Sequence, residues 1–218
     1  MVVPTCNRRE VLARCLDALA AQTYPNYEII VVDDCSTDDT PQFLASFADR
    51  HPRLPFRWFR NQSHAGANPS RNRGIRESQG SLVAFLDNDC IAQPDWLEQL
   101  LSGFSSEKVA AVTGLVEDPP PTNIYELTYK GTHRIHRWGR ARRLVAGNMC
   151  VRRALLLDYM LDEDRAPRVR SAEGTPDVSV SGRCDEEGLY LLLRAAGHEQ
   201  RVVPEAVVLH EHHFTGQT

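Results

Sequence analysis

Leu82-Val83-Ala84-Phe85-Leu86-Asp87-Asn88-Asp89 is a short apolar run that ends in two aspartates one residue apart. Such a run is typical of a strand buried on both faces of a sheet. A second run, Glu28–Asp33, also ends in an aspartate. In open α/β sheets, ligands bind at the carboxyl ends of the strands. The aspartates therefore indicate a polar site at that edge, where Asp87 and Asp89 suit a divalent cation, although such a pair alone more often marks a plain turn.

Outward from this run, short apolar stretches alternate with segments of helical periodicity, the pattern of parallel strands joined by crossover helices. The expected strands are 28–33, 56–60, 82–86, 109–116, 144–151 and 201–209. The expected helices are 8–21, one that begins near 38–41, 71–79, 94–104, and a last one that opens at 184–187 and ends before Gly197. Asn7 and Glu10 have the spacing of a capping box for the first helix. The sequence therefore predicts an α/β fold with a mostly parallel central sheet flanked by helices.

The chain has 218 residues, which suits a single compact domain, at roughly 100–200 residues per domain. Lysine and arginine number 25 and aspartate and glutamate 29, and this net charge of −4 argues against a general nucleic-acid binder. The 6 cysteines form neither a C-x-x-C pair nor a short Cys/His box, so we expect reduced thiols and a cytoplasmic location. No apolar run approaches the roughly 20 residues that a transmembrane helix needs.

Three further segments suit a functional site, and each also has a purely structural interpretation. The Gly- and Asn-rich loop 61–70 leads to Arg71, expected at a helix start where phosphate binds readily; the alternative is a flexible surface loop. Asp185 and Glu186 open a helix, where acids complement the dipole and a carboxylate stays ionised, as a general base must be. His210 follows a buried strand and is either a metal ligand or a hydrogen-bonded structural residue.

Short motifs follow one another along the chain. In the first half they are Val3-Pro4-Thr5-Cys6-Asn7-Arg8, Val32-Asp33-Asp34-Cys35-Ser36-Thr37-Asp38-Asp39-Thr40, Asn61 followed by Ser70-Arg71-Asn72-Arg73-Gly74-Ile75, and Leu86-Asp87-Asn88-Asp89. In the second half they are Gly147-Asn148-Met149, Asp185-Glu186 followed by Arg194-Ala195-Ala196-Gly197, and the run from Val203 to His210. Their order and spacing resemble those of family 2 glycosyltransferases, which have the GT-A fold. The resemblance covers nearly the whole chain.

The resemblance implies a nucleotide-sugar donor that lies across the carboxyl edge of the sheet, with Mn²⁺ or Mg²⁺ as the cofactor. The implied contacts are Thr5 and one or both of Asp33 and Asp34 for the nucleoside, Arg71 for the nucleotide, Asp87 and Asp89 for the ribose and metal, Gly147 and Asn148 for the donor sugar and acceptor, and His210 for the metal or diphosphate. Asp89 is the more direct metal ligand of its pair. Residues 1–116 would bind the donor, and 117–218 would carry the acceptor contacts and the base.

Two positions depart from the family pattern. The usual Glu-Asp pair falls on Asp185-Glu186, so its order is reversed; Glu186 matches the position of the general base, and Asp185 stays an alternative. Cys35 stands where glycine is usual, so the turn either avoids a positive φ or tolerates one at some cost.

The expected function is an inverting glycosyltransferase that moves a sugar from a UDP-, GDP- or dTDP-sugar to a glycan, lipid-linked or small-molecule acceptor. The alternatives are a degenerate, non-catalytic sugar-nucleotide-binding module and, less favoured, a sugar-phosphate nucleotidyltransferase. The basic stretch 133–143 either binds an anionic acceptor at the inner face of a membrane, as a peripheral association, or is a mobile loop.

Overall fold

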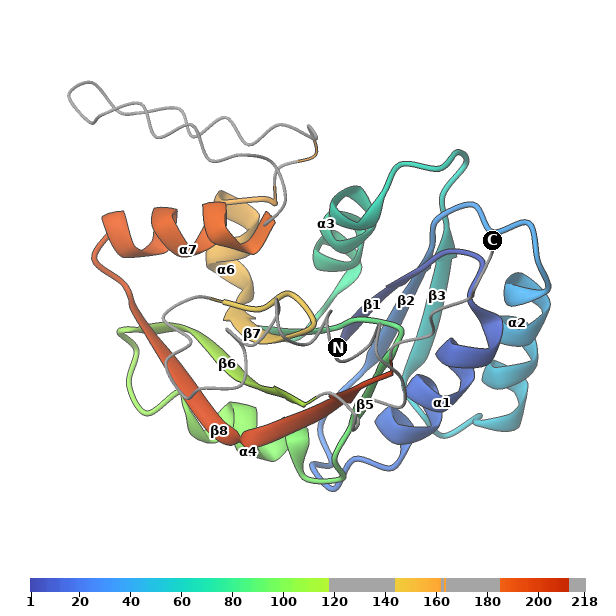
Figure 1. Ribbon diagram of the computed structural model, residues 1–218, viewed down its shortest axis with the longest axis horizontal. Coiled ribbons are helices and arrows are strands. Elements are labelled where there is room, and N and C mark those ends of the chain that lie inside the picture. The colour runs from blue at the N-terminus through green and yellow to red at the C-terminus, as the bar shows by residue number, and fades with distance from the viewer. Residues whose placement is uncertain (118–143, 162, 164–184, 212–218) are drawn as a thin grey trace, which may run out of the picture.

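The computed structural model describes residues 1–117, 144–161, 163 and 185–211 (Figure 1). The helices are α1 Arg9–Ala20, α2 Thr40–Arg50, α3 Ala67–Glu77, α4 Trp96–Ser102, α6 Arg153–Asp158 and α7 Asp185–Ala195. The strands are β1 Val2–Thr5, β2 Ile29–Asp33, β3 Phe56–Arg60, β4 Leu82–Leu86, β5 Cys90–Ala92, β6 Val109–Glu117, β7 Asn148–Arg152 and β8 Glu199–His210. The strands form one sheet in the order β3-β2-β1-β4-β7-β6-β8-β5, with helices on both sides.

The first half of the sheet is entirely parallel. Strands β3, β2, β1 and β4 pair in parallel, and Thr5 lies opposite Asp33 at the carboxyl ends of β1 and β2. Beyond β4 the sheet is mixed: β7 runs antiparallel to β4 and β6, whereas β6 and β8 are parallel. The α/β fold expected from the sequence is confirmed, with its parallel character concentrated in this first half.

Two apolar cores flank the sheet, which explains the unbroken apolar runs of its strands. Val3 and Val31 face the layer of α1, α2 and α4, whereas the neighbouring Val2 and Ile30 face α3, α6 and α7. All four side chains are fully buried. Because successive residues of a strand point to opposite faces, a strand covered on both faces needs apolar residues at every position.

Helix α3 begins at Ala67 rather than at residue 71, so Arg71 lies inside the helix and not at its start as expected. The turn that precedes the helix is made by Gly66, whose φ of 104° is accessible mainly to glycine. The N–H groups of Ala65 and Gly66 bind the carboxylate of Asp34 and fix this early start. Asp34 lies in the loop after β2, far from Gly66 in the sequence, so local sequence does not reveal these bonds.

The capping box expected for α1 does not form. The N-cap is Arg8, and no side chain caps the helix. Asn7 instead adopts a φ of 51°, and its Oδ1 accepts hydrogen bonds from the N–H groups of Thr37 at 2.7 Å and Asp38 at 3.3 Å. The side chain of Asn7 therefore joins the β1–α1 loop to the β2–α2 loop.

Other boundaries agree with the sequence more closely. Strands β3 and β4 have the expected limits, and Pro41 lies in the first turn of α2. Strand β7 is shorter than expected and starts at Asn148. Gly197 follows α7 with a φ of 79°, as expected for a residue that ends a helix. Within the described ranges, no helix has both the length and the apolar character that a bilayer span requires.

We predict that Gly74→Ala destabilises the protein by roughly 1–3 kcal/mol. A Cβ at Gly74 in α3 would collide with Cγ1 of the fully buried Val2 and lie 3.0 Å from its Cγ2. Urea denaturation measures the change in the free energy of unfolding.

Gly188→Ala is the matched control, because Gly188 is also helical but has open space around its Cβ position. Alanine should there stabilise the helix by about 0.5–1 kcal/mol. Equal effects of the two substitutions would show that α3 does not press against β1.

Candidate active site

A cavity of about 420 Å³ opens at the carboxyl edge of the parallel strands. Its lining includes six of the residues singled out from the sequence: Thr5, Asp34, Arg71, Asp87, Asp89 and His210. Arg8, His64, Ser70 and Asn88 complete much of the polar wall. Asp33, Gly147, Asn148 and Glu186 are not among the described residues that line it. The structure therefore brings together the predicted nucleoside, nucleotide and metal contacts.

Asp87 is held from two sides. Nη2 of Arg71 donates a hydrogen bond to Oδ1 of Asp87 at 2.7 Å, while Nη1 contacts Oδ1 of Asn68 at 3.2 Å. The Arg71 side chain is only 8% exposed, and its buried Nε has no hydrogen-bond partner. On the other side, a Cβ at Gly147 would lie 2.9 Å from Oδ2 of Asp87, which explains why glycine fits there.

Asp89 and His210 meet because β5 starts directly after Asp89 and pairs antiparallel with the end of β8, with Cys90 opposite His210. Oδ1 of Asp89 lies 3.4 Å from Nε2 of His210. Two atoms at this separation can both lie about 2.1 Å from one cation, at an angle of roughly 100–110°, which is close to tetrahedral and wider than the angle of about 90° in an ideal octahedron. The spacing of these two atoms thus fits a shared divalent ion.

The ionisation of the groups around this pair also fits a metal centre. Burial alone would raise the pKa of Asp89, but hydrogen bonds and charges from His210 and Arg8 lower it below its usual value. The thiol of Cys90 is close enough to join Asp89 and His210 in a three-residue group. Burial and the neighbouring aspartates raise the pKa of Cys90 far above its usual value, so this thiol stays protonated. In the metal-free protein, Asp89 therefore offers a charged oxygen ligand, whereas Cys90 offers a neutral thiol.

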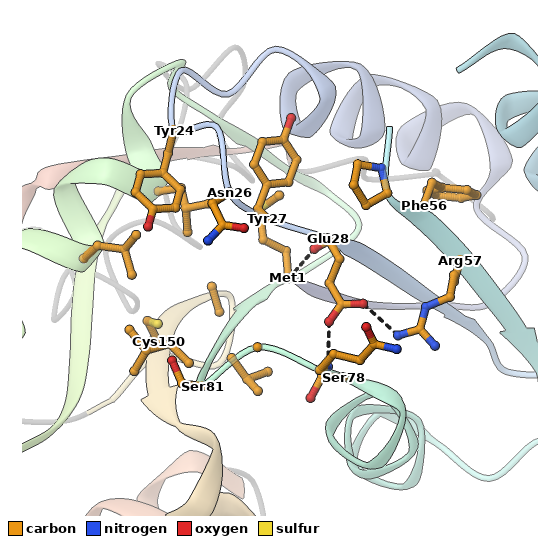
Figure 2. A pocket seen from close by; sticks show the side chains of 18 of the residues that line it. Met1, Tyr24, Asn26, Tyr27, Glu28, Phe56, Arg57, Ser78, Ser81 and Cys150 are labelled. Carbon is orange, nitrogen blue, oxygen red and sulfur yellow. Dashed lines mark hydrogen bonds and ion pairs between the residues drawn. The ribbon is translucent and has the colours of Figure 1, made fainter. Parts of the chain in front are cut away.

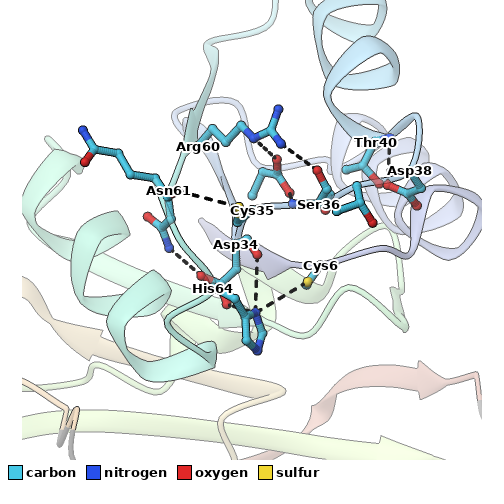
Figure 3. A network of polar contacts seen from close by, with 12 residues as sticks. Cys6, Asp34, Cys35, Ser36, Asp38, Thr40, Arg60, Asn61 and His64 are labelled. Atoms are coloured by element: carbon cyan, nitrogen blue, oxygen red, sulfur yellow. Dashed lines mark hydrogen bonds and ion pairs between the residues drawn. The ribbon is translucent and has the colours of Figure 1, made fainter.

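The carboxylate of Asp34 organises the opposite wall of the cavity (Figure 3). It accepts hydrogen bonds from Asn61 Nδ2 at 2.8 Å, Ala65 N at 2.9 Å and Gly66 N at 2.7 Å, and it lies 2.8 Å from Nδ1 of His64. Burial would raise the pKa of Asp34, but these donors together lower it. The side chain is almost fully engaged in holding the loop that carries His64.

Asp33 is fully buried beneath this network and does not line the cavity. Its Oδ1 accepts a hydrogen bond from Ser36 N, and its Oδ2 lies 3.5 Å from Nε of Arg60. Cys35, between these residues, has a φ of 62°. Of the two interpretations of this cysteine, the turn tolerates a positive φ, at a cost of roughly 1–2 kcal/mol relative to glycine.

Asn148 points into the interior of the molecule. Its amide donates to the carbonyls of Leu115 and Ala206 and accepts from Nε1 of Trp96, at 2.8–3.0 Å. These bonds join β6, β8 and α4 to β7, and the side chain is fully buried. Glu186 lies in the first turn of α7 and is partly exposed. The basic stretch 133–143 lies outside the described residues.

Arg8 and His64 also line the cavity, although their sequence context predicted no role for either. Arg8 is the last residue of a quoted motif, and His64 lies in the Gly- and Asn-rich loop. Only the fold shows that these two side chains reach aspartates far away in the sequence, His64 reaching Asp34 and Arg8 reaching Asp89. Arg8 Nη1 lies 2.6 Å from Oδ2 of Asp89.

A larger cavity, of about 730 Å³, opens at the amino ends of the same strands (Figure 2). Its charged side chains already have partners. Arg57 forms an ion pair with Glu28 at 2.7 Å, and Glu28 also accepts a hydrogen bond from the backbone N–H of Gln79 at 2.6 Å. None of the predicted site residues lines it. The smaller cavity at the carboxyl edge therefore holds the chemically suited groups.

Comparison with known proteins places the whole arrangement in one family. Residues 1–158 match the family model described as glycosyl transferase family 2. Glycosyltransferase AglE of Haloferax volcanii is 36% identical over 119 residues, which are 54% of this chain and 38% of AglE. The putative teichuronic acid biosynthesis glycosyltransferase TuaG of Bacillus subtilis is 33% identical over 111 residues, 51% of this chain and 43% of TuaG. The chain thus spans less than half the length of these two relatives.

Solved structures share the fold at lower identity. The mannosyltransferase PcManGT from Pyrobaculum calidifontis, in complex with GDP-Man and Mn²⁺, has a TM-score of 0.75 and 20% identity, covering 99% of this chain and 57% of that chain. TarS 1-349 of S. aureus, in complex with UDP-GlcNAc, has a TM-score of 0.66 and 19% identity, covering 100% and 60%. These similarities confirm the GT-A fold. The family model matches well over half of the residues of this chain, and the chain therefore belongs to glycosyl transferase family 2.

Proposed function

We propose that this protein transfers a sugar from a nucleoside-diphosphate sugar to an acceptor hydroxyl, with inversion at the anomeric carbon. The observation that carries the proposal is the convergence of Thr5, Arg71, Asp87, Asp89 and His210 on one cavity at the carboxyl edge of the sheet. In this arrangement residues 1–116 bind the donor, and residues 117–218 provide the acceptor contacts and the base.

The comparisons support the class of donor and acceptor. PcManGT is seen with GDP-Man and Mn²⁺, and TarS with UDP-GlcNAc. The putative function of TuaG is in teichuronic acid biosynthesis. By analogy, the donor here is a UDP-, GDP- or dTDP-sugar, and the acceptor is a glycan, a lipid-linked sugar or a small molecule.

Asp89 and His210 would hold Mn²⁺ or Mg²⁺, with Asp87 beside them. When bound, this ion neutralises the charge that develops on the leaving diphosphate. Thr5 is placed for the nucleoside, because it lines the cavity, where its Oγ1 accepts a hydrogen bond from Asn88 Nδ2 at 2.9 Å. Arg71 adds a buried positive charge, which favours a donor that carries phosphate.

The transfer itself needs a base, and we assign that role to Glu186, with Asp185 as the alternative. The carboxylate takes the proton of the acceptor hydroxyl, whose oxygen forms the new bond to the anomeric carbon. The bond from that carbon to the phosphate oxygen breaks at the same time, and its electron pair leaves with the nucleoside diphosphate. The N-terminus of α7 favours the charged form of Glu186.

We predict that UDP or GDP raises the melting temperature of the wild-type protein and that Mn²⁺ enlarges this shift, because a ligand of the native state stabilises it. In Asp89→Asn the Mn²⁺-dependent part of the shift should disappear. Asp39→Asn, at a side chain that is 65% exposed outside the cavity, serves as the control. A flat response of the wild-type protein to both nucleotides would count against the proposed function.

Glu186→Gln should lower the rate of sugar transfer by roughly 10²–10⁴-fold, the usual contribution of a general base, with nucleotide binding retained. Asp185→Asn should have a much smaller effect. Product formation with a nucleotide-sugar donor and isothermal titration with the nucleotide measure the two quantities. The opposite order of effects would assign the base to Asp185, and intact transfer in the double variant would contradict both assignments.

Asp34 supports the nucleoside side of the cavity by holding its wall rather than by presenting a free carboxylate. Asp34→Asn should destabilise the fold by roughly 2–4 kcal/mol at pH 7, because the amide offers a single acceptor to several donors. Since the folded pKa of Asp34 lies below its usual value, the ionised group stabilises the fold above about pH 3.9. This contribution is lost as the pH falls through the folded pKa.

Urea denaturation at several pH values tests this prediction. The difference between the wild-type protein and Asp34→Asn should be largest near pH 7 and shrink as the pH falls below the usual pKa of an aspartate and through the folded pKa of Asp34. Asp39→Asn, which removes the same charge at an exposed position, should change stability little at either pH. A difference that is constant with pH would mean that the carboxylate charge does not hold the loop.

A further inference from the structure

Arg8 lines the cavity and forms an ion pair with Asp89 to which the proposed reaction gives no role. It is the N-cap residue of α1, and its Nη1 lies 2.6 Å from Oδ2 of Asp89. The Arg8 side chain is 54% exposed, whereas that of Asp89 is 18% exposed. The carboxylate is therefore the fixed partner, and the guanidinium is free to take other positions in the solvent-facing part of the site.

The contact places Arg8 in competition with a metal ion. Oδ1 of Asp89 faces His210, and Oδ2 is bound by Arg8, so both oxygens have a positive or hydrogen-donating neighbour. A divalent cation shared by Asp89 and His210 would lie close to the guanidinium and repel it. The proposed metal ion and Arg8 would thus compete for the carboxylate of Asp89.

The second arginine of the site behaves differently. Arg71 is 8% exposed, and its guanidinium is bound by Asp87 and Asn68. Its position inside α3 leaves it little room to move. Of these two arginines in the cavity lining, only Arg8 combines a direct contact to the carboxylate of Asp89, the proposed metal ligand, with a largely exposed side chain.

We propose that the guanidinium of Arg8 exchanges partners, from Asp89 to the diphosphate of the donor, as metal and donor bind. The inference rests on the proposed function, because it assumes the metal at Asp89 and His210. A diphosphate beside that metal presents oxygens that match the planar fork of an arginine. Arg8 lines the same cavity as Asp87 and Asp89, so its freed fork faces the space that the donor fills.

The exchange has two consequences of opposite sign. Removing Arg8 removes a competitor for Asp89, so the protein should bind a metal ion more tightly in the absence of nucleotide. The same change removes a partner of the diphosphate, so the metal-loaded protein should bind nucleotide more weakly. A purely structural ion pair between α1 and Asp89 would not strengthen metal binding when it is cut.

The test measures Mn²⁺ binding to Arg8→Gln by the electron paramagnetic resonance signal of free Mn²⁺, and then UDP and GDP binding at saturating Mn²⁺ by calorimetry. We expect Mn²⁺ alone to bind the variant about 5- to 20-fold more tightly, in the usual range of coupling between sites. The better of the two nucleotides should bind roughly 10-fold more weakly. Arg8→Lys, which keeps the charge without the fork, should weaken nucleotide binding with little gain in Mn²⁺ affinity.

Arg9→Gln is the matched control, because Arg9 is the neighbouring exposed arginine and pairs with Asp39 outside the cavity. It should leave both affinities unchanged. Unchanged Mn²⁺ affinity, or unchanged nucleotide affinity, in Arg8→Gln would overturn the exchange. When the wild-type protein binds Mn²⁺ and Asp89→Asn does not, unchanged affinities in Arg8→Gln refute only the role of Arg8 and leave the metal site intact. When the wild-type protein binds no Mn²⁺, both the proposed metal site and the exchange are refuted.

Discussion

The gathering of carboxylates at one edge of the sheet is the constraint on which the site and much of the fold depend. Parallel β1, β2 and β4 end side by side, and so deliver four aspartates to a small region. Like charges this close are unfavourable unless each finds a partner. The partners lie at 2.6–3.5 Å: Arg60 for Asp33, His64 for Asp34, Arg71 for Asp87, and Arg8 and His210 for Asp89.

Burial divides these acids into two kinds. The side chains of Asp33 and Asp34 are at most 4% exposed and bind the backbone of neighbouring loops, whereas those of Asp87 and Asp89 are 36% and 18% exposed. The backbone N–H groups bound to these buried carboxylates, Ser36 for Asp33 and Ala65 and Gly66 for Asp34, fix the loops that they belong to. The more open pair keeps oxygen atoms within reach of a ligand. The same residue type thus serves the architecture at the end of β2 and, in the proposed reaction, the chemistry after β4.

The sequence was informative where the signal is local and less so where a contact spans the sheet. Unbroken apolar runs predicted β2 and β4 well, because a strand buried on both faces needs apolar residues throughout. The predicted start of α3 and the predicted capping role of Asn7 were wrong, because Gly66 and Asn7 form hydrogen bonds with residues of the loop after β2. From the sequence, the turn at Cys35 could either avoid or tolerate a positive φ, and only the backbone of the folded protein shows that it tolerates one. Family motifs identified the aspartates of the site, but nothing in their spacing reveals that Arg8 pairs with Asp89.

Gly147 and Asn148 show how a matched motif can act through the backbone. The amide of Asn148 is used inside the sheet, where it binds carbonyls at Leu115 and Ala206 on β6 and β8. That anchoring fixes the start of β7 and with it Gly147, whose missing side chain lets the chain pass against Oδ2 of Asp87. A larger residue at 147 would push on the carboxylate that Arg71 holds from the other side. The two residues therefore support the site from beneath by setting where Asp87 stands.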